Sequence, residues 1–242
     1  MKQPPRSLKS GLALMGQSSI FSEETVSNSE AVAAAKSLTI ANLHLPNQAE
    51  YKVLINPNSL QQQQMLLAFE QGKYYQPEVT QLLMQVLQPG DCFVDLQAEI
   101  GYFVALAAMI VGDRGKVIAC ESDSNHAAQL AETVRLNAFR QVQAVQAEAD
   151  LALIDRLLAA NPQPKLIKLN LDQAVLLLRQ GDRSISYLLC AVESAVSNWQ
   201  NLTKEWAAIG YRGLALTSTG LQPLPQAGAL KGSYLLMVHQ AV

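Results

Sequence analysis

The chain has 242 residues, of which 49% are hydrophobic, so it carries enough apolar material for one large buried core. Lysine and arginine number 18 and aspartate and glutamate 20, and the charges are interspersed without a basic block. This balance excludes the basic patch typical of proteins that bind nucleic acid or an anionic membrane surface. The longest uninterrupted apolar stretch, 103–111, is well below the roughly 18 residues that span a bilayer, so we expect no membrane span.

The cysteines indicate a reducing compartment. Cys92, Cys120 and Cys190 are odd in number, widely spaced and set in apolar runs, which predicts buried free thiols. The N-terminus lacks the apolar core of about 7 to 15 residues that a secretory signal needs. We therefore expect a cytoplasmic protein.

The chain divides into two regions of different composition. Residues 1–50 are rich in Ser, Gln, Asn and Pro, which predicts a partly disordered N-terminal arm ahead of a domain at 51–242. A strand is expected at 51–56 and helices at 59–71 and 77–87.

From residue 92 onward, short apolar runs alternate with segments of helical period, which is typical of a doubly wound α/β domain with a mostly parallel sheet. We expect the last two strands to form an antiparallel pair, because no helical segment separates them. Seven sheet strands are predicted, at 92–96, 116–120, 142–146, 165–171, 185–194, 211–218 and 233–240.

Acidic residues follow the first two strands of this sheet. In an open parallel sheet, ligands bind outside the carboxyl ends of the strands at the point where the strand order reverses. Glu121 lies 20 positions past Gly101, the offset at which an acid after the second strand reaches the ribose hydroxyls of a nucleotide. The alternative is that Glu121 caps the next helix or faces solvent.

A resemblance to a known family begins at the same residues. The stretch CFVDLQAEIGYF at 92–103 resembles the first motif, approximately F-V-D-V-G-A-N-I-G-Y-F, of S-adenosylmethionine-dependent methyltransferases of the FkbM type. The segment LIKLNLDQAVLLLRQG at 166–181 resembles a second motif of that family, and similarity in the same order covers about 51–240. The resemblance implies the Rossmann-like class I methyltransferase fold, with S-adenosylmethionine as cofactor.

The resemblance also implies roles for single residues. Asp95 would orient the loop after the first strand, Glu121 would hold the ribose, and Asp172 would lie near the methionine end or the acceptor as a candidate base. The residues alone leave an alternative open for two of these positions: Asp95 is no more than the cap of the following helix, and Lys168 does no more than flank the sheet. The expected cofactor-binding set is Asp95, Gln97, Glu99, Gly101, Glu121 and Asn170, and the expected substrate side is Tyr75 and Glu78.

The departures from the family pattern cluster where the cofactor would lie. Gln97 replaces the first glycine of the motif and Glu99 its asparagine, which adds bulk and negative charge. In the second motif, Asp-Val-Glu-Gly becomes Asn-Leu-Asp-Gln at 170–173. These changes leave two hypotheses open.

The first hypothesis is methyl transfer from S-adenosylmethionine to an oxygen or nitrogen of an unidentified small-molecule, glycan or protein acceptor. The second is a catalytically inactive methyltransferase-like binding or scaffold module, a pseudoenzyme with a decayed cofactor pocket. The three histidines share no metal-ligand spacing with the cysteines, so we expect no metal site. The sequence leaves the oligomeric state open.

Overall fold

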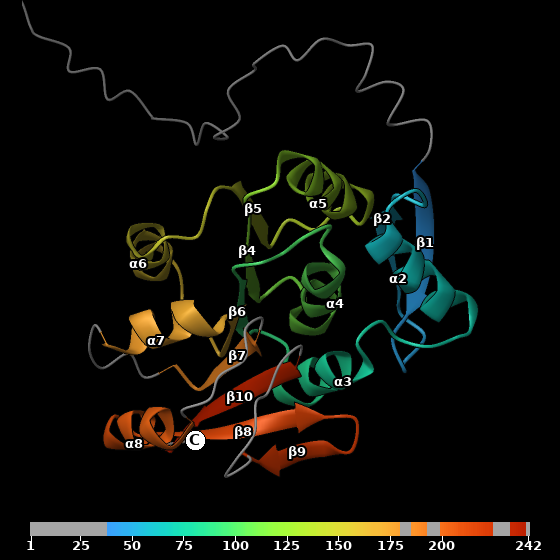
Figure 1. Ribbon diagram of the computed structural model, residues 1–242. Helices are drawn as coiled ribbons and strands as arrows, with labels where there is room; N and C mark the ends of the chain where they lie inside the picture. Colours follow the sequence, from blue (N-terminus) through green and yellow to red (C-terminus); the bar gives the residue numbers. More distant parts are fainter. Residues whose placement is uncertain (1–37, 180–184, 193–198, 225–232, 241–242) are drawn as a thin grey trace, which may run out of the picture. The chain divides into compact units, whose positions relative to one another are not determined.

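The computed structural model describes residues 38–179, 185–192, 199–224 and 233–240, which belong to one compact unit beginning at Ser37 (Figure 1). The N-terminal arm expected from the sequence lies outside the described residues as far as position 37.

The core of the unit is an eight-stranded sheet in the order β5-β4-β3-β6-β7-β10-β8-β9. The five strands from β5 to β7 run parallel, and β10 lies antiparallel between β7 and β8. The chain winds outward from β3 to β5 and then returns to the other side of β3, so the order reverses between β3 and β6. The strands are β3 (Cys92–Asp95), β4 (Lys116–Glu121), β5 (Val142–Gln146), β6 (Leu166–Asn170), β7 (Tyr187–Val192), β8 (Tyr211–Thr217), β9 (Gly220–Pro223) and β10 (Ser233–His239).

This arrangement confirms the predicted doubly wound α/β fold and its antiparallel C-terminal strands. The predicted number of seven sheet strands is wrong, because β9 adds an eighth at the edge. β9 pairs with β8 across a tight turn that ends at Gly220, whose φ of +102° glycine adopts without strain. Its four residues are all exposed and too short to show the alternating pattern of a half-buried strand.

Helices cover both faces of the sheet (Figure 1). One hydrophobic cluster joins one face of the sheet to α2, α3, α4 and α5, and a second joins the other face to α6, α7 and α8. Neighbouring strand residues such as Phe93 and Val94 enter opposite clusters, as the two-residue period of a strand requires. The helices are α2 (Leu60–Glu70), α3 (Pro77–Val86), α4 (Tyr102–Val111), α5 (Ser124–Leu136), α6 (Leu151–Ala160), α7 (Leu171–Arg179) and α8 (Trp199–Ala208).

A separate two-stranded ribbon precedes these helices. β1 (Thr39–His44) pairs antiparallel with β2 (Glu50–Ile55), although the sequence placed residues 38–50 in the arm and predicted no strand there. The ribbon is fastened to α5: the Leu54 backbone N–H donates to Thr133 Oγ1 at 3.1 Å, and Asn137 bonds both the N–H and the carbonyl of Lys52. These contacts place the ribbon beside the helix that starts at the candidate site.

Two predictions about composition can be compared with the structure. The three cysteines are free and buried, as expected. None of the helices in the described part of the chain is long and apolar enough to cross a membrane.

Candidate functional site

The β3–α4 loop, Leu96–Gly101, crosses the carboxyl ends of the strands where the strand order reverses. The Leu96 N–H donates to the carbonyl of Lys168 on β6 at 2.9 Å, and the Ala98 N–H donates to the carbonyl of Cys120 on β4 at 3.0 Å. The loop is therefore held between β4 and β6 by its own backbone.

A buried ion pair lies beneath this loop. Asp95 at the end of β3 is fully buried, and its Oδ1 accepts a hydrogen bond of 2.9 Å from Nζ of Lys168. Nζ also donates to the Gln97 carbonyl at 2.7 Å, while Asp95 Oδ1 accepts from the Gln97 N–H at 3.1 Å. Burial alone would lower the pKa of the lysine, but the carboxylate beside it outweighs burial and holds the pKa above its usual value. Asp95 and Lys168 thus pair with each other, and both bond the backbone of the loop at Gln97.

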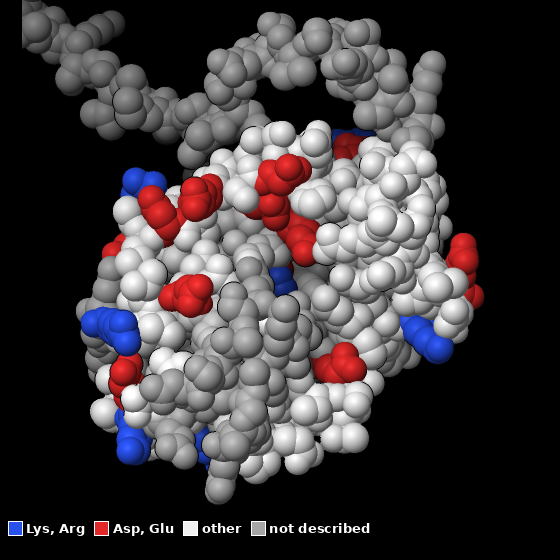
Figure 2. Space-filling view, viewed as in Figure 1, with Lys and Arg blue, Asp and Glu red and all other residues white. Residues whose placement is uncertain are grey.

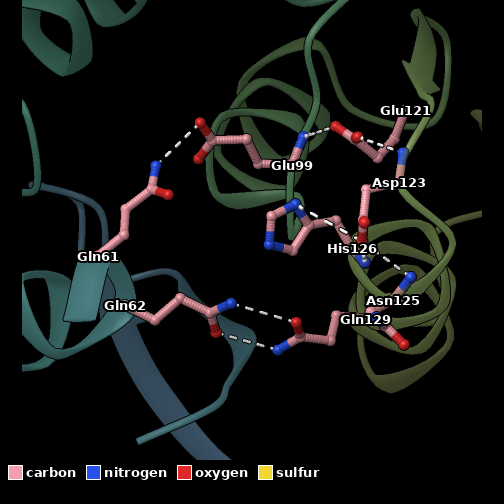
Figure 3. A network of polar contacts seen from close by, with 8 residues as sticks. All are labelled: Gln61, Gln62, Glu99, Glu121, Asp123, Asn125, His126 and Gln129. Atoms are coloured by element: carbon pink, nitrogen blue, oxygen red, sulfur yellow. Dashed lines mark hydrogen bonds and ion pairs between the residues drawn. The ribbon is translucent and has the colours of Figure 1, made fainter. Parts of the chain in front are cut away.

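Glu121 closes the other side of the loop. Its Oε2 accepts from the backbone N–H of Glu99 at 2.7 Å, and its Oε1 accepts from the N–H of Asp123 at 2.8 Å (Figure 3). The side chain is buried. Each carboxylate oxygen can accept a second hydrogen bond, so both oxygens keep acceptor capacity. The alternative that Glu121 caps α5 is wrong, because Asp123 accepts from the N–H groups of Asn125 and His126 and is the cap.

Glu99 is held from two directions. Its backbone has a φ of +47°, a conformation that side chains other than Asn, Asp and Gly rarely adopt. Its carboxylate accepts from Nε2 of Gln61 on α2 at 3.0 Å, on the side away from Glu121 (Figure 3). The loop residue that departs from the family's asparagine therefore links α2 to the loop.

Gly101 has a local role that accounts for its place in the motif. Its φ is +90°, and a Cβ at this position would lie 2.7 Å from Leu130 Cδ1 on α5. Glycine thus permits the turn into α4 and the close approach of α5.

The sequence analysis missed the part that α2 plays. Gln62 on α2 and Gln129 on α5 are buried and exchange two side-chain hydrogen bonds, of 3.2 and 3.0 Å (Figure 3). Gln62 also accepts from the Asn56 N–H at 2.6 Å. The run of four glutamines in the sequence marks the helix, but its pattern alone does not show that one of the four is buried.

The residues after β6 serve the start of α7. Asn170 Oδ1 accepts from the Gln173 N–H at 2.7 Å, and Gln173 Oε1 accepts from the Asn170 N–H at 3.0 Å, which is a reciprocal helix cap. Asp172 is exposed in the first turn of α7. The structure therefore uses Asn170, expected to contact the cofactor, as a cap, and it leaves Asp172 outside the loop cluster formed by Asp95, Glu99, Glu121 and Lys168.

An aromatic cavity lies between the loop, the α2–α3 segment and β10. Its volume is about 20 Å³, room for one water molecule. Tyr75 packs edge-on against Tyr102, and their ring centroids are 5.7 Å apart. Glu78, expected beside Tyr75, is half-buried in the first turn of α3 and does not line this cavity. The described lining residues are Met65, Tyr75, Gln76, Gln97, Ala98, Glu99, Ile100, Tyr102, Phe103, Lys168 and Tyr234.

Polar groups join the walls of the aromatic cavity. The Tyr234 hydroxyl donates to Gln76 Oε1 at 2.8 Å, and Gln76 Nε2 donates to the Tyr75 hydroxyl at 3.2 Å. Burial, followed by the nearby Glu99 carboxylate, raises the pKa of Tyr75. Figure 2 shows one face of the molecule, on which acidic side chains gather near a narrow hollow with a basic side chain at its floor.

A larger groove lies beyond the ends of β5 and β6. Its volume is about 420 Å³, and it is lined by Ala149, Asp150, Leu151, Ala152, Ile154, Gln173 and Leu176. Two positions before the groove residue Ala149, the Ala147 N–H donates to the Glu121 carbonyl at 2.9 Å.

Comparisons with known proteins found similar solved structures at low sequence identity. No family model and no curated protein matches the chain. Among solved structures, M. jannaschii TYW2 in complex with AdoMet is 13% identical with a TM-score of 0.46, over 84% of this chain and 85% of that one. Precorrin-6y C5,15-methyltransferase from Geobacter metallireducens is 15% identical with a TM-score of 0.45, over 69% and 88%. An rRNA methylase from Streptococcus thermophilus is 13% identical with a TM-score of 0.42, over 66% and 93%.

Proposed function

We propose that this chain binds S-adenosylmethionine at the carboxyl ends of β3 and β4 and transfers its methyl group to an oxygen or nitrogen acceptor, as an FkbM-like methyltransferase. The observation that carries the proposal is the position of Glu121. Its carboxylate ends β4 beside the point where the strand order reverses, and each oxygen retains one lone pair after accepting a backbone N–H. Two hydroxyls of a ribose match two such acceptors.

The nucleoside half of the cofactor fits this arrangement. The groove of about 420 Å³ beyond β5 and β6 has mainly apolar walls and is large enough for an adenine ring. The β3–α4 loop is held in place by Lys168 and Glu121, so the protein itself orders the backbone that a ribose would meet.

The amino-acid half of the cofactor fits the site less well than the nucleoside half. The aromatic cavity beside the loop has room for one water molecule, and Glu99 adds a carboxylate to its wall. Lys168 already bonds Asp95 and the Gln97 carbonyl. We therefore derive no catalytic step, and Asp172 as a base, like the exclusion of nucleic acid as an acceptor, stays a prediction.

Glu121→Ala tests the ribose assignment. A charge-assisted hydrogen bond contributes about 1.5 to 3 kcal/mol, so the change should weaken S-adenosylmethionine binding at least about tenfold in calorimetric titration. Glu132→Ala, a change at a half-buried carboxylate on α5 that pairs with Arg135, is the control and should leave affinity unchanged. Unaltered binding by a folded Glu121→Ala variant would show that the ribose lies elsewhere.

The tight aromatic cavity favours a second candidate, a non-catalytic module whose cofactor pocket has decayed. Under this reading, Gln97→Gly with Glu99→Asn should increase S-adenosylmethionine affinity, because asparagine accepts the positive φ at 99 and the added charge is removed. Under the first reading, the same double change should reduce affinity or leave it unchanged, since both side chains would then contribute to the site. The sign of the change separates the two.

A further inference from the structure

The end of the site next to the loop carries an unusual balance of charge. Of the described residues that line the aromatic cavity, Lys168 is the one cation and Glu99 the one anion. Lys168, however, is neutralised by Asp95 at 2.9 Å, and the second oxygen of Asp95 has no hydrogen-bond partner in the structure. In the described part of the chain, Lys168 is therefore the one cation shared by two carboxylates, those of Asp95 and Glu99, and one negative charge is in excess at this end of the site.

The aromatic walls add to this preference for positive charge. Tyr102 and Phe103 pack edge to face at a centroid distance of 5.0 Å, and Tyr75 lies against both rings. Ring faces carry negative potential, which attracts ammonium groups and repels carboxylates. The rings already tolerate a cation, because Nζ of Lys168 lies 5.5 Å from the centroid of Phe103.

The size of the aromatic cavity also favours an ammonium group. A cavity of about 20 Å³ admits one water-sized group. A primary ammonium group is close to water in size and donates three hydrogen bonds, whereas an α-amino acid end also brings a carboxylate, which exceeds the room for one water-sized group. The side chains of Glu99 and Tyr75 supply acceptors on the cavity wall.

From these three observations, we propose that the aromatic cavity selects an adenosine sulfonium whose tail carries a primary amine and no carboxylate. This inference rests on the proposed nucleoside site. The ligand of this chemistry is decarboxylated S-adenosylmethionine. The nucleoside would lie on Glu121, and the tail ammonium would lie in the aromatic cavity beside Glu99.

The experiment compares two ligands on the unmodified protein. Calorimetric titration with decarboxylated S-adenosylmethionine and with S-adenosylmethionine should show at least about tenfold tighter binding of the decarboxylated form. Glu99→Gln keeps the size of the side chain and an acceptor for Gln61, and should reduce this ratio to about threefold or less. Glu70→Gln, exposed at the end of α2, is the control and should leave the ratio unchanged.

The outcomes separate this inference from the function on which it rests. Equal or tighter binding of S-adenosylmethionine, weakened by Glu121→Ala, would overturn the tail preference and keep the nucleoside site. Binding of neither ligand to the parent protein would overturn both. A preference for the decarboxylated form that Glu99→Gln leaves intact would overturn the role of Glu99 in binding the ammonium group. The comparison of the two ligands on the parent protein tests the preference even where a variant fails to fold.

Discussion

Lys168→Met tests the buried ion pair that holds the β3–α4 loop. Methionine keeps the length of the side chain and removes the charge, which leaves the fully buried Asp95 with the 3.1 Å bond from the Gln97 N–H. Removing one partner of a buried pair costs about 3 to 5 kcal/mol, because the remaining charge stays desolvated. The lost bond to the Gln97 carbonyl adds about 1 kcal/mol.

Urea unfolding gives the measurement. At a slope of about 2 to 3 kcal/mol per molar, a total loss of about 4 to 6 kcal/mol lowers the midpoint by roughly 1.3 to 3 M. The double variant Asp95→Asn with Lys168→Met removes both charges and should recover most of the loss.

The dependence on pH has a definite sign. Burial already raises the pKa of Asp95, and removing Lys168 should raise it further. A carboxyl group whose pKa is higher in the folded state destabilises the fold as pH rises through that pKa. The cost of Lys168→Met should therefore be larger at about pH 8 than at about pH 4.5. A loss below about 1 kcal/mol at both values, or a double variant no more stable than the single one, would refute the assignment of Lys168 as the partner that holds Asp95.

Two further predictions concern the fold around the site. Gly101→Ala should lower the free energy of unfolding by about 2 kcal/mol or more, because the new Cβ combines a φ of +90° with a contact of 2.7 Å to α5. Gly90→Ala, with a φ of +95° and open space around the new Cβ, should cost about 1 kcal/mol, and equal losses of the two variants in thermal unfolding would contradict the packing role of Gly101. Burial raises the pKa of all three cysteine thiols, so at pH 8 a thiol reagent should label none in the native protein and all three after denaturation, and fast native labelling would contradict their burial.

Much of this architecture could be predicted from local sequence. Apolar runs at 92–96 and 116–120 alternate with helical segments, and this period alone indicates a parallel sheet between helices. Because ligand sites in such sheets lie at the strand ends, Asp95 and Glu121 could be placed near each other before any contact was known. The N-x-x-Q pattern at 170–173 also predicts the helix cap formed by Asn170 and Gln173, whereas the resemblance implied a cofactor contact for Asn170.

Other features depended on partners that are distant in the chain. Among the described strands, β1 pairs with β2 and the short edge strand β9 pairs with β8. Gln62 differs from the other glutamines of its run because Gln129, 67 positions later, faces it.

The sequence by itself determined the order of the strands and helices other than β1 and β9, and it determined which strands end in acidic or basic residues. Both follow from neighbouring residues, because secondary-structure period and strand-end position are local properties. Only the tertiary structure decided which lone pairs and charges remain available for a ligand. Lys168 is paired with Asp95, 73 positions away, whereas Glu99 forms no ion pair with any residue that the structure describes. That difference sets the charge of the site, and it arises from the packing of β3, β4 and β6 into one sheet.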